Sequence, residues 1–199
     1  MIHELIRAAL VPATLLFVAL LVVLYLRVYR FNRTANDVVP YLRWLDFEQM
    51  QDLLSPEQDR HFRQHLPARQ FREFQEKRIR LSVEFLVRSS HNAEILRSWG
   101  WYELRRSWRT KDRKAGRTSR ELINAAVQCK IIGLALRFKL YFWLLRMTLF
   151  PFLGTPGFAA LLPLGSSYLL RVYTKTKVAA VELSRMYGAE YHEQLVQVL

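Results

Sequence analysis

Residues 8–26 read AALVPATLLFVALLVVLYL, nineteen consecutive residues without a charged side chain. At about 1.5 Å of rise per residue, a helix of this length covers roughly the 30 Å hydrocarbon thickness of a bilayer. The run is followed directly by Arg27, Arg30 and Arg33 rather than by the small residues of a signal-peptide cleavage site. A buried core helix of this length would normally carry a polar stripe. The sequence therefore predicts a transmembrane anchor with a basic flank in residues 1–33.

The charges on either side of this run predict its orientation. Arg7 is the one arginine before it, whereas three arginines follow it within seven positions. Cytoplasmic flanks carry the excess of Arg and Lys. We therefore expect a single-pass protein of a bacterial-type inner (plasma) membrane, with the N-terminus outside and the C-terminal domain in the cytoplasm. The single cysteine, Cys129, excludes a disulfide framework and is consistent with a reducing compartment.

The rest of the chain predicts an all-α fold. Of its 199 residues, 51% are hydrophobic and 24% charged, which is enough apolar material for a core and excludes a disordered chain. From residue 36 onward every strong hydrophobic period is helical, and no alternating run of five residues occurs. The expected helices cover residues 38–54, 56–67 with Ser55 as N-cap, 68–98, 122–150 and 167–198, the last loosened at Gly188.

Two apolar stripes occur at helical spacing; such stripes usually pack into a core, and a dimer seam stays open for the C-terminal one. One comprises Phe71, Phe74, Leu81 and Phe85; the other comprises Leu169, Val172, Ala179, Leu183 and Met186. Together with the anchor, these patterns predict three regions. They are the anchor in 1–33, a basic helical cytoplasmic region in 34–120 that ends in a polybasic loop, and an apolar helical hairpin with a C-terminal helix in 121–199.

Residues 147–170 form a second uncharged run, but prolines and glycines interrupt it and basic residues flank it on both sides. Three interpretations stay open: a helical hairpin that dips into the cytoplasmic leaflet, a hairpin in the core of a soluble domain, or a second span. The positive-inside tendency disfavours the span. The preceding helix, 122–150, is not expected to span, because Arg137 and Lys139 would lie near mid-bilayer on opposite sides of it.

The most distinctive charged feature is a polybasic stretch with tryptophans at its start. Residues 105–120 hold eight cations against Asp112, a charge of +7 out of +13 for the chain. We expect part of this stretch to be a loop, with Ser119 capping a helix that begins near Glu121. The residues predicted to bind a membrane surface or phosphate groups are Arg105, Arg106, Arg109, Lys111, Arg113, Lys114, Arg117, Arg120, Trp99, Trp101 and Trp108. Single-stranded nucleic acid, or a plain solvated loop or protein contact, are the alternatives.

No residue pattern predicts catalysis, a metal or a cofactor. Glu57, His61 and His65 share one side of a predicted helix, but Phe62 stands where a zincin helix has its glutamate, so solvated histidines are the favoured interpretation. Cys129 has apolar neighbours, which is typical of a buried thiol rather than a nucleophile. No phosphate-binding glycine loop or hydrolase motif occurs, and no motif names a family.

The sequence therefore favours a non-enzymatic, membrane-anchored helical scaffold or adaptor that lies on the anionic inner leaflet. Its expected partners are anionic lipids and another membrane or cytosolic protein. The first alternative is a membrane-tethered nucleic-acid-binding protein, and the second is an enzyme acting on a lipid or hydrophobic substrate at the bilayer.

Overall fold

The computed structural model describes residues 34–46, 49, 53, 56–150 and 165–199. All of them belong to one compact unit, Arg33–Leu199. They contain helices and turns but no strand, which confirms the all-α prediction. The predicted anchor in residues 1–33 and most of the uncharged run 147–170 lie outside the described residues. In the part of the chain that is described, no helix is both long and apolar enough to cross a membrane.

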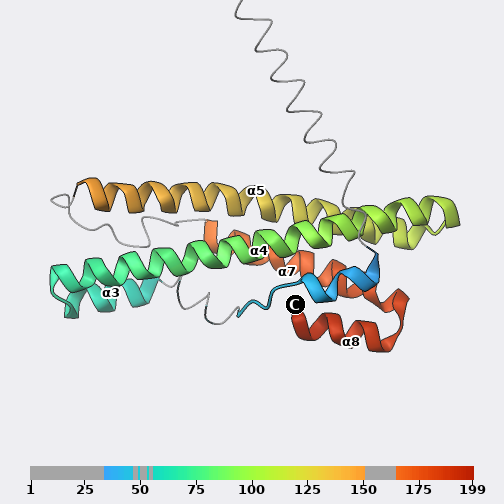
Figure 1. The fold of residues 1–199 in the computed structure, drawn as a ribbon, viewed down its shortest axis with the longest axis horizontal. Helices are drawn as coiled ribbons and strands as arrows, with labels where there is room; N and C mark the ends of the chain where they lie inside the picture. Colours follow the sequence, from blue (N-terminus) through green and yellow to red (C-terminus); the bar gives the residue numbers. More distant parts are fainter. Residues whose placement is uncertain (1–33, 47–48, 50–52, 54–55, 151–164) are drawn as a thin grey trace, which may run out of the picture. The chain divides into compact units, whose positions relative to one another are not determined.

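Two long antiparallel helices dominate the unit (Figure 1). Two short 3₁₀ turns come first, followed by α3, the long pair α4 and α5, then α7, a third 3₁₀ turn and α8. α7 packs against α5 and α4, and α8 packs against α7. The element bounds are η1 Ala35–Asp37, η2 Val39–Tyr41, α3 Pro56–His65, α4 Ala68–Thr110, α5 Arg113–Leu149, α7 Gly165–Ser184, η3 Arg185–Tyr187 and α8 Ala189–Val198.

α4 continues twelve residues beyond its predicted end at Ser98. The Trp99-Gly100-Trp101-Tyr102 sequence, which follows the predicted end, is helical throughout. Gly100 faces α5 so closely that a Cβ there would lie 3.0 Å from Ile123. Glycine lowers helix propensity, but at this position it lets the two helices approach closely.

α5 begins at Arg113, eight residues before its predicted start, so the expected polybasic loop is mostly helix. Ser119 is fully buried within α5 and is not its N-cap; Asp112 has that role. The predicted division after residue 120 consequently falls inside one continuous helix. The predicted loop and Ser119 cap were wrong because Gly116 and Ser119, residues typical of loops, are small residues at a close helix contact here.

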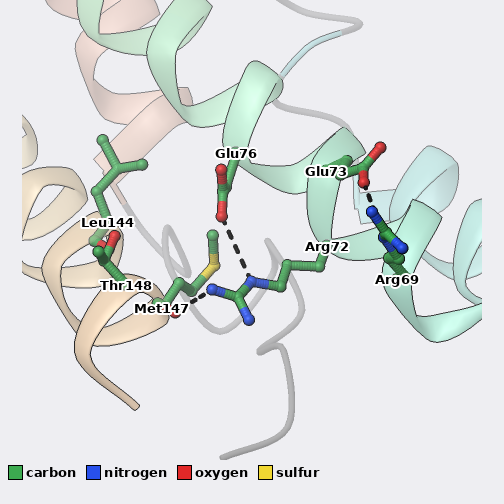
Figure 2. A network of polar contacts seen from close by, with 7 residues as sticks. All are labelled: Arg69, Arg72, Glu73, Glu76, Leu144, Met147 and Thr148. Atoms are coloured by element: carbon green, nitrogen blue, oxygen red, sulfur yellow. Dashed lines mark hydrogen bonds and ion pairs between the residues drawn. The ribbon is translucent and has the colours of Figure 1, made fainter. Parts of the chain in front are cut away.

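Arg72 connects the start of α4 to the end of α5, at the opposite end of the helix pair from the turn between them (Figure 2). Its guanidinium donates to the Met147 carbonyl in the last turn of α5, where backbone acceptors lack partners within the helix, and also contacts Glu76 on α4. A cation at a helix C-terminus is favourable because of the partial negative charge there. The first turns of α4 therefore hold the last turn of α5.

The segment before α3 differs from the helix expected over residues 38–54. It forms η1 and η2 and is then irregular from Leu42 to Asp46. The buried Asn92 side chain accepts from the Arg43 N–H at 2.8 Å and donates to the Arg43 carbonyl at 2.7 Å. Asn92 thus replaces the helical hydrogen bonds that Arg43 would otherwise make, a long-range contact that local spacing cannot reveal.

The buried side chains form two apolar clusters. One lies between α4, α5 and the first half of α7, and the other joins the η1–η2 segment, α4, α5, the second half of α7 and α8. The predicted C-terminal stripe is buried at Leu169, Val172, Ala179 and Leu183, as expected, whereas Met186 is exposed. In the other predicted stripe, Phe71 is buried but Leu81 is half exposed. The helix ends after Ser184, and Gly188, at φ 100°, precedes α8.

A candidate phosphate-binding tip

The turn between α4 and α5 is only two residues long. Lys111 ends α4 in a left-handed conformation, φ 57°, and its N–H donates to the Ser107 carbonyl. Asp112 then caps α5, its carboxylate accepting from the Lys114 and Ala115 N–H groups at 3.0 Å each. These two caps reverse the chain without a loop, so cations from both helices converge at one end of the hairpin.

Small residues bring the two helices together just behind this turn. A Cβ added to Gly116 would lie 2.9 Å from the Ser107 Oγ. A larger residue at this position would force the Ser107 side chain to move, and Ala115 beside it is also buried. The close approach places the next cations of α5 alongside the last turn of α4.

An open groove of about 760 Å³ lies at this tip. Trp108 contributes an indole that is 62% exposed, beside Asp112 and Glu121. The cations that line the groove are Lys111, Arg113, Arg117 and Arg120. Arg109 and Lys114 are also exposed at the same turn. Six of the eight predicted cations therefore gather at one exposed end.

The acidic groups at the tip leave most of this charge uncompensated. Asp112 is engaged by backbone N–H groups as the helix cap. Glu121 contacts Arg117 at 3.1 Å, but both side chains are more than half exposed, and such surface pairs contribute only about 0–1 kcal/mol. Arginine presents a planar fork of donors that matches phosphate oxygens. The arrangement is suited to binding phosphate groups.

The remaining predicted residues do not belong to the groove. Trp99 is fully buried in the core and is not available to a surface, and Trp101 and Arg105 are half buried. Arg106 is exposed, yet it donates to the Tyr187 hydroxyl and lies 3.8 Å from Glu103. Sequence spacing missed this because it shows which residues lie on a helix but not which side its neighbours cover.

Tyr187 connects α4 to the C-terminal elements through a buried carboxylate. Its hydroxyl donates to Glu103, whose side chain is buried. Burial, followed by the hydrogen bond to Glu103, raises the pKa of the Tyr187 phenol above its usual range, which keeps the hydroxyl a donor. The Tyr187 ring also packs near Trp99 and Tyr191. Arg106 and Trp99 are therefore structural in this contact.

The chain matches no family model, no curated protein and no solved structure.

The histidines and the cysteine offer little chemistry. His65 Nδ1 lies 2.7 Å from the His61 carbonyl, so the pair interacts along its own helix. Over the described ranges, no group of three or more His, Cys, Asp or Glu side chains is placed to hold a metal ion. Burial raises the pKa of the Cys129 thiol to about 12, which disfavours the reactive thiolate.

Two features of the site were not predicted from the sequence. The first is the N-cap role of Asp112, although an Asp directly before a helical run is a strong N-cap signal. The second is the exposed apolar side of α5, where large residues recur every three or four positions. That spacing is visible in the sequence, but only the positions of α4 and α7 show that this side is uncovered.

Proposed function

We propose that this protein is a membrane-anchored helical scaffold or adaptor whose basic tip rests on the anionic lipids of the cytoplasmic leaflet. The observation that supports the proposal is the open groove lined by Lys111, Arg113, Arg117 and Arg120. A cation near an anionic membrane contributes about 1 kcal/mol. Six exposed cations against two acids therefore supply about 4 kcal/mol of net attraction, roughly a thousandfold in equilibrium.

The anchor in this proposal is the uncharged run 8–26, with the N-terminus outside. The run 147–170 is proposed to dip into the cytoplasmic leaflet and return, because both of its flanks are basic. The tip and the C-terminus then share the cytoplasm. A cysteine added after Leu199 in a Cys129→Ala background should resist an impermeant thiol reagent on intact spheroplasts. Labelling from outside would indicate a second span.

Extraction of membranes tests the anchor. After a carbonate or high-salt wash, the intact chain should stay in the membrane fraction. Its complete release into the supernatant would refute an integral anchor. Affinity purification from a nanodisc extract, with identification of the proteins and lipids retained, tests the scaffold role.

A matched pair of variants tests the tip. Lys111→Gln, Arg113→Gln and Lys114→Gln together remove three charges from the turn. The control triple, Arg63→Gln, Lys77→Gln and Arg80→Gln, removes three exposed charges from α3 and the first half of α4.

In proteoliposomes, the tip variant should lose the lipid-dependent protection of α4–α5 turn amides in hydrogen exchange. The control, which has the same net charge, should keep most of that protection. Equal behaviour of the two triples would show that net charge, and not the tip, governs binding.

The exposed indole of Trp108 favours nucleic acid as the second candidate. Bases stack on aromatic rings beside cations in single-strand binding proteins. The full chain in nanodiscs should then bind a single-stranded oligonucleotide with an affinity that falls steeply with salt, and Trp108→Ala should weaken it. Binding that is weak and indifferent to salt would remove this candidate.

A further inference from the structure

One side of α5 carries large apolar residues that nothing in the described unit covers. They recur at intervals of three or four positions from the middle of the helix to its last turn. Phe138 is 76% exposed, and the others are 55–63% exposed: Ile131, Leu134, Phe142, Leu145 and Leu149. Monomeric soluble proteins seldom expose a continuous apolar stripe of this kind, which marks an interaction surface.

This apolar stripe shares its side of the helix with the basic tip. At about 100° per residue, Arg113, Arg117 and Arg120 fall within the same arc, about 100° wide, as the six apolar residues. All three arginines are exposed, as are the apolar residues. α5 therefore presents a single face that is cationic over its first two turns and apolar over its second half.

The charges around the stripe indicate which occupant suits it. From Leu122 to Val181 the chain contains seven cations and no Asp or Glu. Lys139 and Arg146 border one edge of the stripe, Arg137 borders the other, and the Arg146 guanidinium lies 4.6 Å from the centre of the Trp143 ring. Two copies packed along the stripe would bring these cations together without an acid to pair with them. An anionic surface would neutralise them.

We propose that this face of α5 is a lipid-embedding surface, with its apolar half inserted among acyl chains and its arginines on anionic headgroups. The proposal rests on the proposed function, because the tip and the stripe must meet the same leaflet. Apolar faces bordered by Lys and Arg are typical of helices that lie in the plane of a membrane interface. Residues 151–164, which follow α5 in the sequence, also carry no charged side chain.

Depth measurements on the full chain in vesicles of phosphatidylcholine and phosphatidylglycerol test this directly. A polarity-sensitive fluorophore is attached to a cysteine at Phe138 or Phe142 in a Cys129→Ala background. The control carries the fluorophore at Val196 of α8, which is also exposed and which α4 and α7 separate from α5 (Figure 1). Quenching by shallow and deep acyl-chain nitroxides gives the depth. Labels at Phe138 and Phe142 should lie about 5–10 Å below the headgroup boundary, and the Val196 label should stay in water.

Four results would overturn the inference. Aqueous labels at both α5 positions, with a tip label still at the headgroups, would refute the inserted face and leave the proposed function intact. Labels hidden from water but beyond the reach of acyl-chain nitroxides would indicate a protein cover. Energy transfer between labelled copies would then identify the cover as a second copy of the chain. Without energy transfer, the cover would be residues 151–164 or 8–26 of the same chain. A chain that fails to co-float with vesicles would refute both proposals.

Discussion

Substituting Gly133 by alanine should destabilise the protein, although alanine is the better helix former. Gly133 is buried on α5, and an ideal Cβ there would lie 2.8 Å from the Ser90 Oγ on α4. Ser90 is itself buried, and its hydroxyl finds no hydrogen-bond partner among the described residues. Something must therefore move when the methyl group is added.

The magnitude follows from two opposing effects. Overpacking a well-filled contact costs about 1–3 kcal/mol, whereas replacing glycine by alanine within a helix gains about 0.5–1 kcal/mol. We expect a net loss of about 1–2 kcal/mol, which lowers the melting temperature by about 2–8 °C for a protein of this size. The assay is thermal unfolding of the full chain in detergent, followed by far-ultraviolet circular dichroism.

A second substitution tests whether the contact itself is responsible. Ser90→Ala removes the clashing atom, and the next contact of the new Cβ is the Leu86 carbonyl at 3.9 Å. The double variant Gly133→Ala/Ser90→Ala should therefore be at least as stable as the wild type, with a coupling of about 1–3 kcal/mol between the sites. If Gly133→Ala alone raises the melting temperature, the helices do not approach as closely as described and the reasoning fails.

Three further predictions concern the tip, the core and the thiol. Lys111→Gly should raise the free energy of unfolding by up to about 1 kcal/mol, because a non-glycine residue is strained at φ 57°. The same substitution should weaken headgroup binding, because it removes a cation from the tip. A lower free energy of unfolding would contradict the strained cap. Asn92→Ala should lower the free energy of unfolding by about 2–3 kcal/mol, because the Arg43 backbone and the Tyr173 hydroxyl lose their hydrogen bonds to Asn92. A decrease of less than about 1 kcal/mol in urea unfolding would argue against these hydrogen bonds. Cys129 should react with a thiol reagent at about pH 8.5 far more slowly in the folded protein than in denaturant, because burial raises its pKa from about 8.5 to about 12. The stability that the neutral thiol contributes is complete below about pH 8.5 and is lost as the pH rises toward 12. Fast labelling of the folded protein would contradict the burial of Cys129.

The sequence predicted the all-helical class and several helix boundaries well because these depend on local signals. Pro56 begins α3 and Pro67 directly precedes α4, as proline requires. Leu149 ends α5 within one residue of the prediction. Gly188 separates the two C-terminal helices because only glycine adopts its backbone conformation easily.

The tip was misjudged because local and tertiary signals conflict there. Gly116 and Ser119 have poor helix propensity, yet the close contact with α4 requires small side chains at these positions. Trp99 shows the opposite case, because a tryptophan next to a basic stretch looks interfacial until α8 is seen to pack over it. The cations were found from composition alone, but their convergence on one groove depends on the two-residue turn at Lys111 and Asp112.

The most direct test of the account measures how far the tip lies from lipid headgroups. A fluorophore on a cysteine at Lys114, in a Cys129→Ala background of the full chain, is paired with an acceptor on the headgroups of nanodisc lipids. With Lys114 replaced, five exposed cations against two acids still supply about 3 kcal/mol of net attraction. The tip should therefore be held at the headgroups in discs that contain phosphatidylglycerol at low salt, and released at high salt or in phosphatidylcholine alone. Energy transfer that is the same in both lipids and at both salt concentrations would contradict the binding of anionic lipid by this tip.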